Sequence, residues 1–379
     1  ISKEVCVTFA VVTGGGTSGH VIPAMSICEA LIDAGHDATE LRYVGTIRGV
    51  ETSLMADSPV ESLFLPISGL QRSLSVRGIV RNMALPWRLL RSRFIARRYL
   101  SKWSPQVVVS VGGYASEPMS RAAIAAGIPM VCVSYDHLAG LATRRQAKHA
   151  KVCAVAFANS DLPRAHVTGA PVRRELRNLQ VSEYRSKARQ VLGVPAENIL
   201  IVFMGGSLGS QSINSVAVAY VQQQVANVET QVSVLHICGE RFLQEPIPDM
   251  ASGVHYQRVG YEPRMAEVYA AADIIVARAG ASTVAEIATV GVASVLIPWP
   301  GAADNHQEHN ARWLSNDGAA VLSDDSSCRN GVTLQIVQDL AGNKELQAKL
   351  AKRAREKGDI HRSNELVKVI ENAASSARS

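Results

Sequence analysis

Short runs of apolar, mostly β-branched residues recur along the chain, and each is followed by a glycine-rich turn and a stretch with helical spacing. This alternation is typical of parallel βαβ units with helices on both faces of the sheet. Four of the strand-to-turn junctions are distinctive. They are Phe9–Thr13 before GGGTSGH, Val107–Val111 before GGYASEP, Ile199–Met204 before GGSLGSQSIN, and Ile274–Arg278 before AGASTVAE.

The four junctions predict two similar domains. The first junction resembles the third and the second resembles the fourth, so the same pair occurs once in each half. We expect two Rossmann-like, doubly wound α/β domains, residues 1–170 and 171–345, with a boundary near VTGAPVRREL, Val167–Leu176. Residues 346–379 are helical in composition and either complete the second domain or return to the first. Ligands bind at the carboxyl ends of parallel strands, so we expect all four junctions around one cleft.

Composition narrows the class of protein. A chain of 379 residues suits two domains, and its net charge of +6 is mild. The six cysteines are scattered without a C-x-x-C pair, which favours reduced core thiols in a cytoplasmic protein over disulfides or zinc. No apolar run reaches the roughly 18 to 20 residues that span a bilayer, and no secretory signal pattern opens the chain.

The opening loop has the G-x-G-x-x-G spacing of dinucleotide-binding proteins at Gly14, Gly16 and Gly19. That function also needs a carboxylate about 20 residues further on, at the tip of the second strand. The expected strand, Glu40–Val44, has none at its tip, so a dehydrogenase is the least favoured alternative. His20 follows at the helix start, where an imidazole serves as a base or phosphate donor, or only packs under the loop.

The second half offers groups suited to a nucleotide sugar. The Ser207 hydroxyl, in a glycine turn at a helix start, suits a phosphate, although a tight turn alone explains the sequence. Glu286 lies three residues beyond Thr283, near another helix start. A carboxylate there serves either as a helix cap or as an acceptor for ribose hydroxyls. Further along, amide and imidazole side chains that suit sugar hydroxyls gather at His306, Gln307 and Asn310.

The motifs GGGTSGHVIPA, VVSVGGYASEP, HVTGAPVRREL, MGGSLGSQSIN, RAGASTVAE and PGAADNHQEHNA, in this order, resemble the MurG family across nearly the whole chain. This resemblance implies a GT-B fold and inverting, metal-independent transfer of N-acetylglucosamine from UDP-N-acetylglucosamine, without a cofactor. The implied acceptor is a polyprenyl-diphosphate-linked muramyl peptide, converted from lipid I to lipid II in peptidoglycan synthesis, a step of cell wall biogenesis that serves cell shape and division.

The resemblance also implies roles for individual residues. Glu286 matches the carboxylate that holds the donor ribose, Ser207 the serine at the diphosphate, and Gln307 the glutamine that recognises the sugar. His20 is the expected catalytic base, with Asp136 as the alternative. The implied donor-binding residues are Thr17, Ser18, Gly19, Arg173, Ser207, Ala281, Ser282, Thr283, Val284, Glu286 and Gln307, and the implied acceptor-side residues are Gly15, Gly16 and Tyr114.

Two stretches depart from the family pattern. Ser18 replaces a loop glycine, and VSYDHLAG stands where the family has a His-Glu-Gln-Asn stretch, so that Asp136 occupies the place of an asparagine. These departures leave open a paralogous transferase with another UDP-sugar or lipid-linked acceptor, and a non-catalytic paralogue that binds lipid-linked sugar. A UDP-sugar 2-epimerase, which shares the two-domain plan, is a further alternative.

A basic segment between Ser62 and Ser116 contains no Asp or Glu. Its arginines alternate with apolar residues, which suits a peripheral protein on the anionic cytoplasmic face of the membrane; a solvated helix face is the simpler alternative. Nucleic acid is not an expected partner because no aromatic stacking platform accompanies the charges, whereas other cell-wall enzymes are possible partners. The basic residues are Arg72, Arg77, Arg81, Arg88, Arg91, Arg93, Arg97, Arg98 and Lys102.

Overall fold

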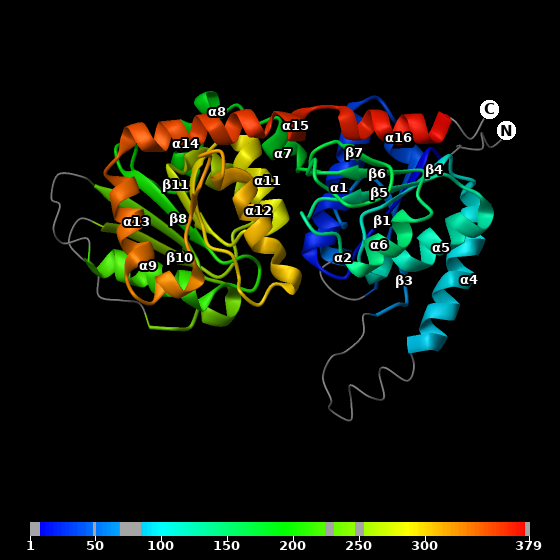
Figure 1. Cartoon of the computed structure of the whole chain (residues 1–379), viewed down its shortest axis with the longest axis horizontal. Coiled ribbons are helices and arrows are strands. Elements are labelled where there is room, and N and C mark those ends of the chain that lie inside the picture. Colours follow the sequence, from blue (N-terminus) through cyan, green and yellow to red (C-terminus); the bar gives the residue numbers. More distant parts are fainter. Residues whose placement is uncertain (1–7, 48–50, 69–84, 224–230, 247–253, 376–379) are drawn as a thin grey trace. The chain divides into compact units, whose positions relative to one another are not determined.

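The structure is a computed structural model that describes residues 8–47, 51–68, 85–223, 231–246 and 254–375. Arg72, Arg77 and Arg81 of the basic segment lie outside these residues. The chain divides into two compact units (Figure 1). The first unit comprises Ile1–Arg174 and Ser363–Ser379, and the second comprises Glu175–Arg362.

The first unit is built on a parallel sheet whose described strands are ordered β3-β2-β1-β4-β5-β6-β7. The central strands β1, β4 and β5 are buried along their whole length and mostly apolar, because helices cover both faces of the sheet. The chain reverses its direction of winding between β1 and β4, the position at which ligands bind in such sheets. The strands are β1 (Ala10–Thr13), β2 (Leu41–Thr46), β3 (Glu61–Leu65), β4 (Val107–Ser110), β5 (Met130–Ser134), β6 (Val152–Val155) and β7 (Ala165–Val167).

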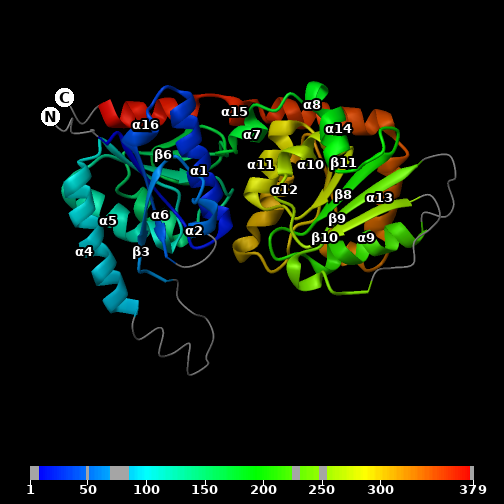
Figure 2. The ribbon, with the colours of Figure 1, turned by 180° about the vertical axis from the view of Figure 1, so that it is seen from behind.

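The last helix of the chain, α16 (Glu365–Ser375), belongs to this first unit. It packs on β4, β5, β6 and α1, and both ribbon views place it beside these elements (Figures 1 and 2). Its apolar face, including Ile370, is buried, and Glu371 binds His36 at 3.1 Å. The other helices are α1 (Ser18–Asp33), η1 (Ala38–Glu40), α2 (Glu51–Leu54), α4 (Leu85–Trp103), η2 (Tyr114–Ser116), α5 (Glu117–Ala126) and α6 (Leu141–Ala147).

The second unit repeats the plan with the strand order β10-β9-β8-β11-β12-β13. Its strands are β8 (Ile199–Met204), β9 (Val232–Ile237), β10 (Val254–Val259), β11 (Ile274–Ala277), β12 (Ala293–Leu296) and β13 (Val321–Leu322). Its helices are α7 (Arg174–Arg177), α8 (Val181–Val191), α9 (Gln211–Gln223), η4 (Glu240–Phe242), α10 (Met265–Ala271), α11 (Ala281–Val290), η5 (Ala303–Asn305), α12 (His306–Ser315), η6 (Asp325–Cys328), α13 (Val332–Ala341), α14 (Lys344–Lys357) and α15 (Asp359–Arg362).

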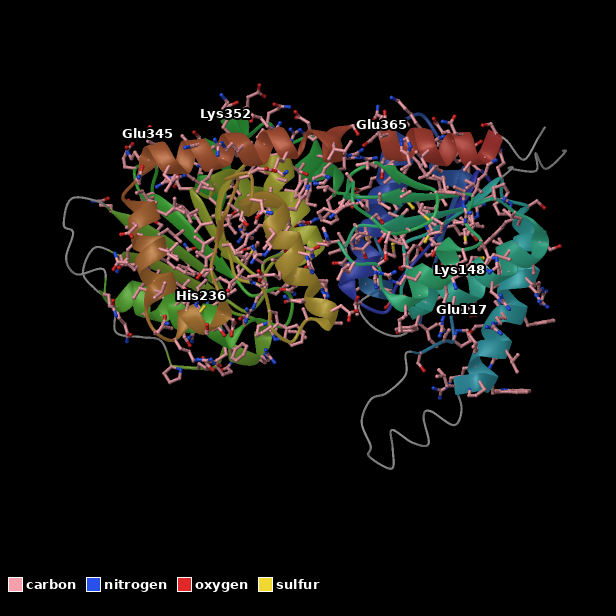
Figure 3. The ribbon with its side chains drawn as sticks, viewed as in Figure 1. Glu117, Lys148, His236, Glu345, Lys352 and Glu365 are labelled. Carbon is pink, nitrogen blue, oxygen red and sulfur yellow. The ribbon has the colours of Figure 1, made fainter. Side chains whose placement is uncertain are left out.

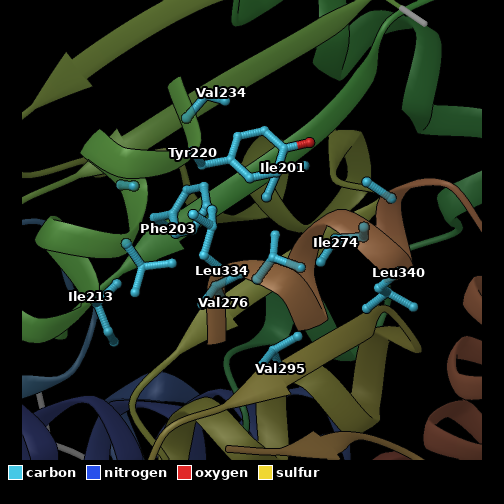
Figure 4. Close-up of a cluster of buried hydrophobic side chains, with 14 of the residues drawn as sticks. Ile201, Phe203, Ile213, Tyr220, Val234, Ile274, Val276, Val295, Leu334 and Leu340 are labelled. Atoms are coloured by element: carbon cyan, nitrogen blue, oxygen red, sulfur yellow. The ribbon is translucent and has the colours of Figure 1, made fainter. Parts of the chain in front are cut away.

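Apolar packing between sheet and helices fixes these strands. In the second unit Phe203 of β8 and Val276 of β11 meet Tyr220 of α9 and Leu334 of α13, all buried (Figure 4). The charged side chains of Glu345 and Lys352, by contrast, are exposed on α14 (Figure 3). Burial of this apolar surface, at about 25 cal/mol per Å², is the main force holding each sheet to its helices.

The predicted fold class, two doubly wound parallel α/β domains, is confirmed. The strands end within a few residues of the predicted ends; β2, for example, runs to Thr46. Cys28, Cys132, Cys153, Cys238 and Cys328 are buried free thiols. Among the described residues, no helix is long and apolar enough to cross a membrane, and no cluster of His, Cys, Asp and Glu could hold a metal ion.

Candidate active site

The first part of the site is the loop between β1 and α1. Tyr43 of β2 donates its hydroxyl to the Gly14 carbonyl at 2.8 Å, and the Thr13 hydroxyl donates to the Val44 carbonyl at 2.9 Å. Gly16 has a φ of +95° and lies against the Tyr114 ring, so that a Cβ there would be strained and would collide with the ring. The loop is therefore held at its base by β2 and at its turn by Tyr114.

Glu51, the first residue of α2, seats its carboxylate inside this loop. The carboxylate accepts the backbone N–H groups of Gly16 and Thr46, and the side chain is 1% exposed. Burial raises the pKa of Glu51, while the two N–H donors act in the opposite direction. A Cβ on Gly15 or Gly45 would collide with this carboxylate. The absence of side chains at Gly15 and Gly45 therefore leaves the space that the Glu51 carboxylate occupies.

His20, in the first turn of α1, lies next to the loop after β4. A Cβ on Gly113 would stand 2.7 Å from Cδ2 and 3.2 Å from Nε2 of His20, so only glycine permits the approach. On its other side, Nδ1 lies 2.6 Å from the hydroxyl of Tyr135, the residue that follows β5. The imidazole is held between these two elements at the carboxyl edge of the sheet.

A buried chain of polar groups fixes the loop that carries Gly113. The Ser110 hydroxyl donates to the Gln146 side chain at 2.6 Å, and the Gln146 amide donates to the Ser116 hydroxyl at 2.9 Å. Ser116 in turn donates to the Gly113 carbonyl at 2.9 Å. Every link is buried or nearly so, and such networks are rigid when fully satisfied. Gln146 of α6 thereby positions Gly113 beside His20.

The charge state of His20 is set by two opposing effects. Burial lowers the pKa of His20, and the negative charge of Asp136 raises it by a smaller amount. The imidazole is consequently neutral at neutral pH and has a lone pair that can accept a proton. Asp136 lies directly after Tyr135 and acts on this imidazole through its charge.

The central group of the second unit is Glu286 on α11. The helix begins at Ala281 with Gly280 as its N-cap, and Ser282, Thr283 and Val284 follow in its first turn. The Tyr269 hydroxyl, from α10, donates to Glu286 Oε2 at 2.9 Å, and the Glu286 side chain is 8% exposed. A carboxylate held in this way, on the helix that follows β11, can accept hydrogen bonds from vicinal hydroxyls.

Ser207 lies in the exposed loop between β8 and α9. Because β8 pairs with β11, this loop lies next to the loop that follows β11. Close backbone packing anchors the loop. Gly209 has a φ of +70°, and a Cβ on it would collide with the Cys238 carbonyl. The Ser210 hydroxyl caps the following helix by accepting the Ile213 N–H at 3.4 Å. Ser207 is thus an exposed hydroxyl at a fixed helix start.

Gln307 stands at the start of α12, behind a strained turn. Asp304 and Asn305 both have left-handed φ values, 51° and 53°, which are costly for residues other than glycine. The Gln307 side-chain oxygen accepts the Trp299 N–H at 2.9 Å, which leaves its NH₂ group turned the other way. Asn310 is fully buried and donates to the Ala279 carbonyl at 3.2 Å, so its amide is structural instead of sugar-binding.

The remaining predicted residues fall as follows. Gly15, Gly16, Thr17, Gly19, His20, Tyr114 and Asp136 surround one end of the first sheet, and Ser18 begins α1 there, with its side chain outside the described part. Arg173 is half-buried and belongs to the first unit, which ends at Arg174 in this part of the chain, whereas the predicted donor-binding residues between 207 and 307 belong to the second unit.

Sequence patterns did not single out four residues of the site. Glu51 lies 35 positions from the loop that it binds, and Tyr135, Gln146 and Tyr269 act through contacts between elements. Only Tyr135 carried a signal, because it lies within the stretch that departs from the family pattern.

Two such domains, with glycine junctions at the carboxyl ends of both sheets, have the architecture of GT-B glycosyltransferases. Residues 10–155 match the N-terminal domain and residues 200–366 the C-terminal domain of glycosyltransferase family 28. More narrowly, the chain belongs to the MurG family, as the sequence motifs predicted.

Individual relatives support this assignment over the whole length. The chain is 33% identical, over 96% of its length and 98% of the relative's, to the UDP-N-acetylglucosamine–N-acetylmuramyl-(pentapeptide) pyrophosphoryl-undecaprenol N-acetylglucosamine transferase of Desulforamulus reducens. It is 32% identical to the enzyme of that name from Acinetobacter baumannii, with 94% of the chain and 95% of the relative covered. The crystal structure of A. baumannii MurG superposes with a TM-score of 0.72 at 27% identity, covering 97% of this chain and 99% of that one.

A UDP-GlcNAc 2-epimerase from Neisseria meningitidis also superposes, with a TM-score of 0.66 and 13% identity over 96% of this chain and 99% of that one. This likeness shows the shared fold alone.

Proposed function

We propose that this protein transfers N-acetylglucosamine from UDP-N-acetylglucosamine to a polyprenyl-diphosphate-linked muramyl peptide, with inversion at the anomeric carbon. The observation that carries the proposal is the 33% identity over 96% of the chain to a transferase named for this reaction. The hydrogen bonds that hold His20 and Glu286, each to a tyrosine of its own unit, support it.

In the proposed reaction a hydroxyl oxygen of the acceptor attacks the anomeric carbon as the bond to the UDP oxygen breaks. His20 Nε2 takes the proton of the attacking hydroxyl, so that the departing UDP carries the negative charge away. A neutral imidazole is the form that can accept this proton, and burial keeps His20 neutral at pH 7. Asp136 is the alternative base, and its charge also stabilises the imidazolium that forms.

The second unit is proposed to hold the donor. Glu286 accepts the ribose hydroxyls, Gln307 contacts the sugar, and the N–H groups and hydroxyl at Ser207 bind the diphosphate at a helix start. Ala281, Ser282, Thr283 and Val284 shape the same pocket edge. Arg173 adds positive charge for the leaving group, while Thr17, Ser18 and Gly19 face the diphosphates, with Gly15, Gly16 and Tyr114 on the acceptor side.

The test is transfer of labelled N-acetylglucosamine to a synthetic lipid I analogue, with other UDP-sugars beside it. We expect product only when donor and acceptor are both present. Conversion of the donor alone would indicate the 2-epimerase, and UDP binding without transfer would indicate a non-catalytic paralogue. For His20→Ala we expect turnover about 10²- to 10⁴-fold lower, the usual contribution of a general base; turnover within a few-fold of the parent would remove His20 from this role.

A lipid-linked acceptor requires contact with its membrane, and α4 offers a suitable surface. Trp87, Leu90 and Phe94 are 72%, 58% and 70% exposed on this helix, which also carries exposed Arg91 and Arg98. Several large apolar groups exposed together on one helix form the kind of patch that marks an interaction surface. We propose that this membrane-facing surface of α4, Trp87 to Arg98, binds the anionic cytoplasmic face of the membrane peripherally.

A further inference from the structure

We propose that Tyr135 is a positioning residue that fixes His20 in the tautomer with its proton on Nδ1, so that Nε2 is the atom that accepts the acceptor's proton. The inference deepens the proposed function and rests on it for the catalytic role. The tautomer itself can be measured without any substrate.

The hydrogen-bond geometry at Tyr135 allows one arrangement. The Tyr135 oxygen lies 2.5 Å from the Gly19 carbonyl oxygen and 2.6 Å from His20 Nδ1. A carbonyl oxygen only accepts, so the single hydroxyl proton of Tyr135 must lie between these two oxygens. The hydroxyl can then only accept from Nδ1, which must carry a proton. With Nδ1 protonated in the neutral ring, Nε2 holds the lone pair.

The surroundings preserve this arrangement. Burial and the nearby charge of Asp136 raise the pKa of Tyr135 well above its usual value, so the hydroxyl keeps its proton. On the other side of the ring, Nε2 lies next to Gly113, and no described residue forms a hydrogen bond to it. Gly113, with a φ of +76° and its carbonyl held by Ser116, leaves the space beside Nε2.

The second unit contains an internal reference with the opposite tautomer. His236 is buried in β9 (Figure 3) and bonds through Nε2 to Asn214 Oδ1 at 3.0 Å and through Nδ1 to the Tyr256 hydroxyl at 2.9 Å. Because the Asn214 NH₂ donates to the Cys238 carbonyl, its oxygen is the acceptor, so His236 carries its proton on Nε2. Each histidine thus has a tyrosine at Nδ1, but the proton lies on opposite nitrogens.

Long-range ¹H–¹⁵N correlation spectra of the full chain labelled with [¹⁵N]histidine test the inference. At pH 7.5 we expect a protonated Nδ1 at His20 and a protonated Nε2 at His236, with the His20 signals assigned from their loss in His20→Gln. In Tyr135→Phe, which keeps the ring but removes the acceptor of the Nδ1 proton, His20 should shift toward the Nε2-protonated form while His236 stays unchanged. A wild-type His20 protonated at Nε2, or the same tautomer in Tyr135→Phe, would overturn the proposal.

Kinetics separate this inference from the proposed function. Tyr135→Phe should lower kcat about 10- to 100-fold, less than the 10²- to 10⁴-fold contribution of a general base because His20 itself remains, and leave the KM for the UDP-sugar within about twofold. The acid limb of the kcat/KM profile should move to lower pH, because the hydroxyl that stabilises the imidazolium is lost. Tyr256→Phe, which removes the tyrosine hydroxyl at Nδ1 of His236 instead, should alter neither value. A tautomer shift without a fall in kcat would preserve the hydrogen-bond assignment but count against His20 as the base.

Discussion

The carboxylate of Glu51 accepts the backbone N–H of Gly16, 35 positions earlier in the chain. An internal anion therefore occupies one of the loop N–H groups that a glycine-rich turn usually offers to a phosphate. The N–H groups at the start of α1, Ser18 and Gly19, are the ones a helix leaves for an outside acceptor. Glu51 also accepts the Thr46 N–H, which ties the loop to the end of β2.

Replacing this acid with its amide should loosen the loop. Both carboxylate oxygens of Glu51 accept backbone N–H groups, whereas Glu51→Gln has one oxygen and an NH₂ that would face a donor. A buried donor left without an acceptor costs about 1–3 kcal/mol. We expect faster hydrogen exchange at the end of β2, and a free energy of unfolding, measured by urea titration, that is lower by that amount. The control Glu345→Gln changes an exposed acid of α14, and an equal loss there would contradict this role.

The hydroxyl of Tyr269 should contribute to donor binding through Glu286. Tyr269→Phe removes the 2.9 Å hydrogen bond that orients this carboxylate, and a bond to a charged group contributes about 1.5–3 kcal/mol. Because a water molecule can replace part of this hydrogen-bond free energy, we expect UDP to bind about 3- to 30-fold more weakly, as measured by calorimetry. Tyr220→Phe, a buried tyrosine of α9 in the same unit, is the matched control. Unchanged UDP affinity in Tyr269→Phe would show that Glu286 is oriented by other contacts.

Local signals explain why so much of the fold could be predicted. The strands β1, β4, β8 and β11 are short, mostly apolar runs rich in β-branched residues and followed by glycine turns, so adjacent residues in the sequence indicate both the buried strand and the turn after it. Glu286 could be located in the same way, because its helix start and its distance from Thr283 are features of a single element.

The residues that orient the site could not be found in this way. Tyr135 meets Gly19 across 116 positions, and the partners of Gln146 come from β4 and η2. Such contacts depend on the order of strands in the sheet, which local periodicity does not determine. The prediction that Asn310 suits sugar hydroxyls was wrong for the same reason. The sequence indicates the helix start that carries Asn310, but it does not show that the side chain is buried and bonded to the Ala279 carbonyl.

Acid should destabilise the second unit through His236. Burial, followed by the positive charge of Arg258, lowers the pKa of His236 to about 4, whereas an unfolded histidine titrates near 6.5. Between these values the unfolded chain binds a proton that the folded chain does not, so stability falls as pH falls. From pH 7 to 5 the loss is about 2 kcal/mol for this one group.

Hydrogen exchange of the β8 and β9 amides at both pH values measures this loss for the second unit. His236→Gln should be less stable than the parent at pH 7, because two hydrogen bonds change, but its loss between pH 7 and 5 should be about 2 kcal/mol smaller. An equal loss in parent and variant would mean that His236 takes up its proton as readily when folded.

Vesicle binding by the proposed membrane-binding surface of α4 should depend on the aromatic residues of this helix as well as on its charge. Trp87 and Phe94 are largely exposed, and burying a large apolar side chain is worth about 1.5–3 kcal/mol. The double variant Trp87→Ser, Phe94→Ser should therefore bind vesicles of anionic phospholipid at least about tenfold more weakly in sedimentation assays. Leu141→Ser, which changes an apolar side chain 76% exposed on α6 of the same unit, should bind as the parent does.

The charge of this surface should contribute as well. Since basic groups contribute about 1 kcal/mol each near anionic lipid, the parent should bind neutral vesicles less tightly and lose binding as salt rises. Equal binding of the double variant and the parent would exclude α4 as the contact, while transfer to a short-chain, water-soluble acceptor should be the same in both.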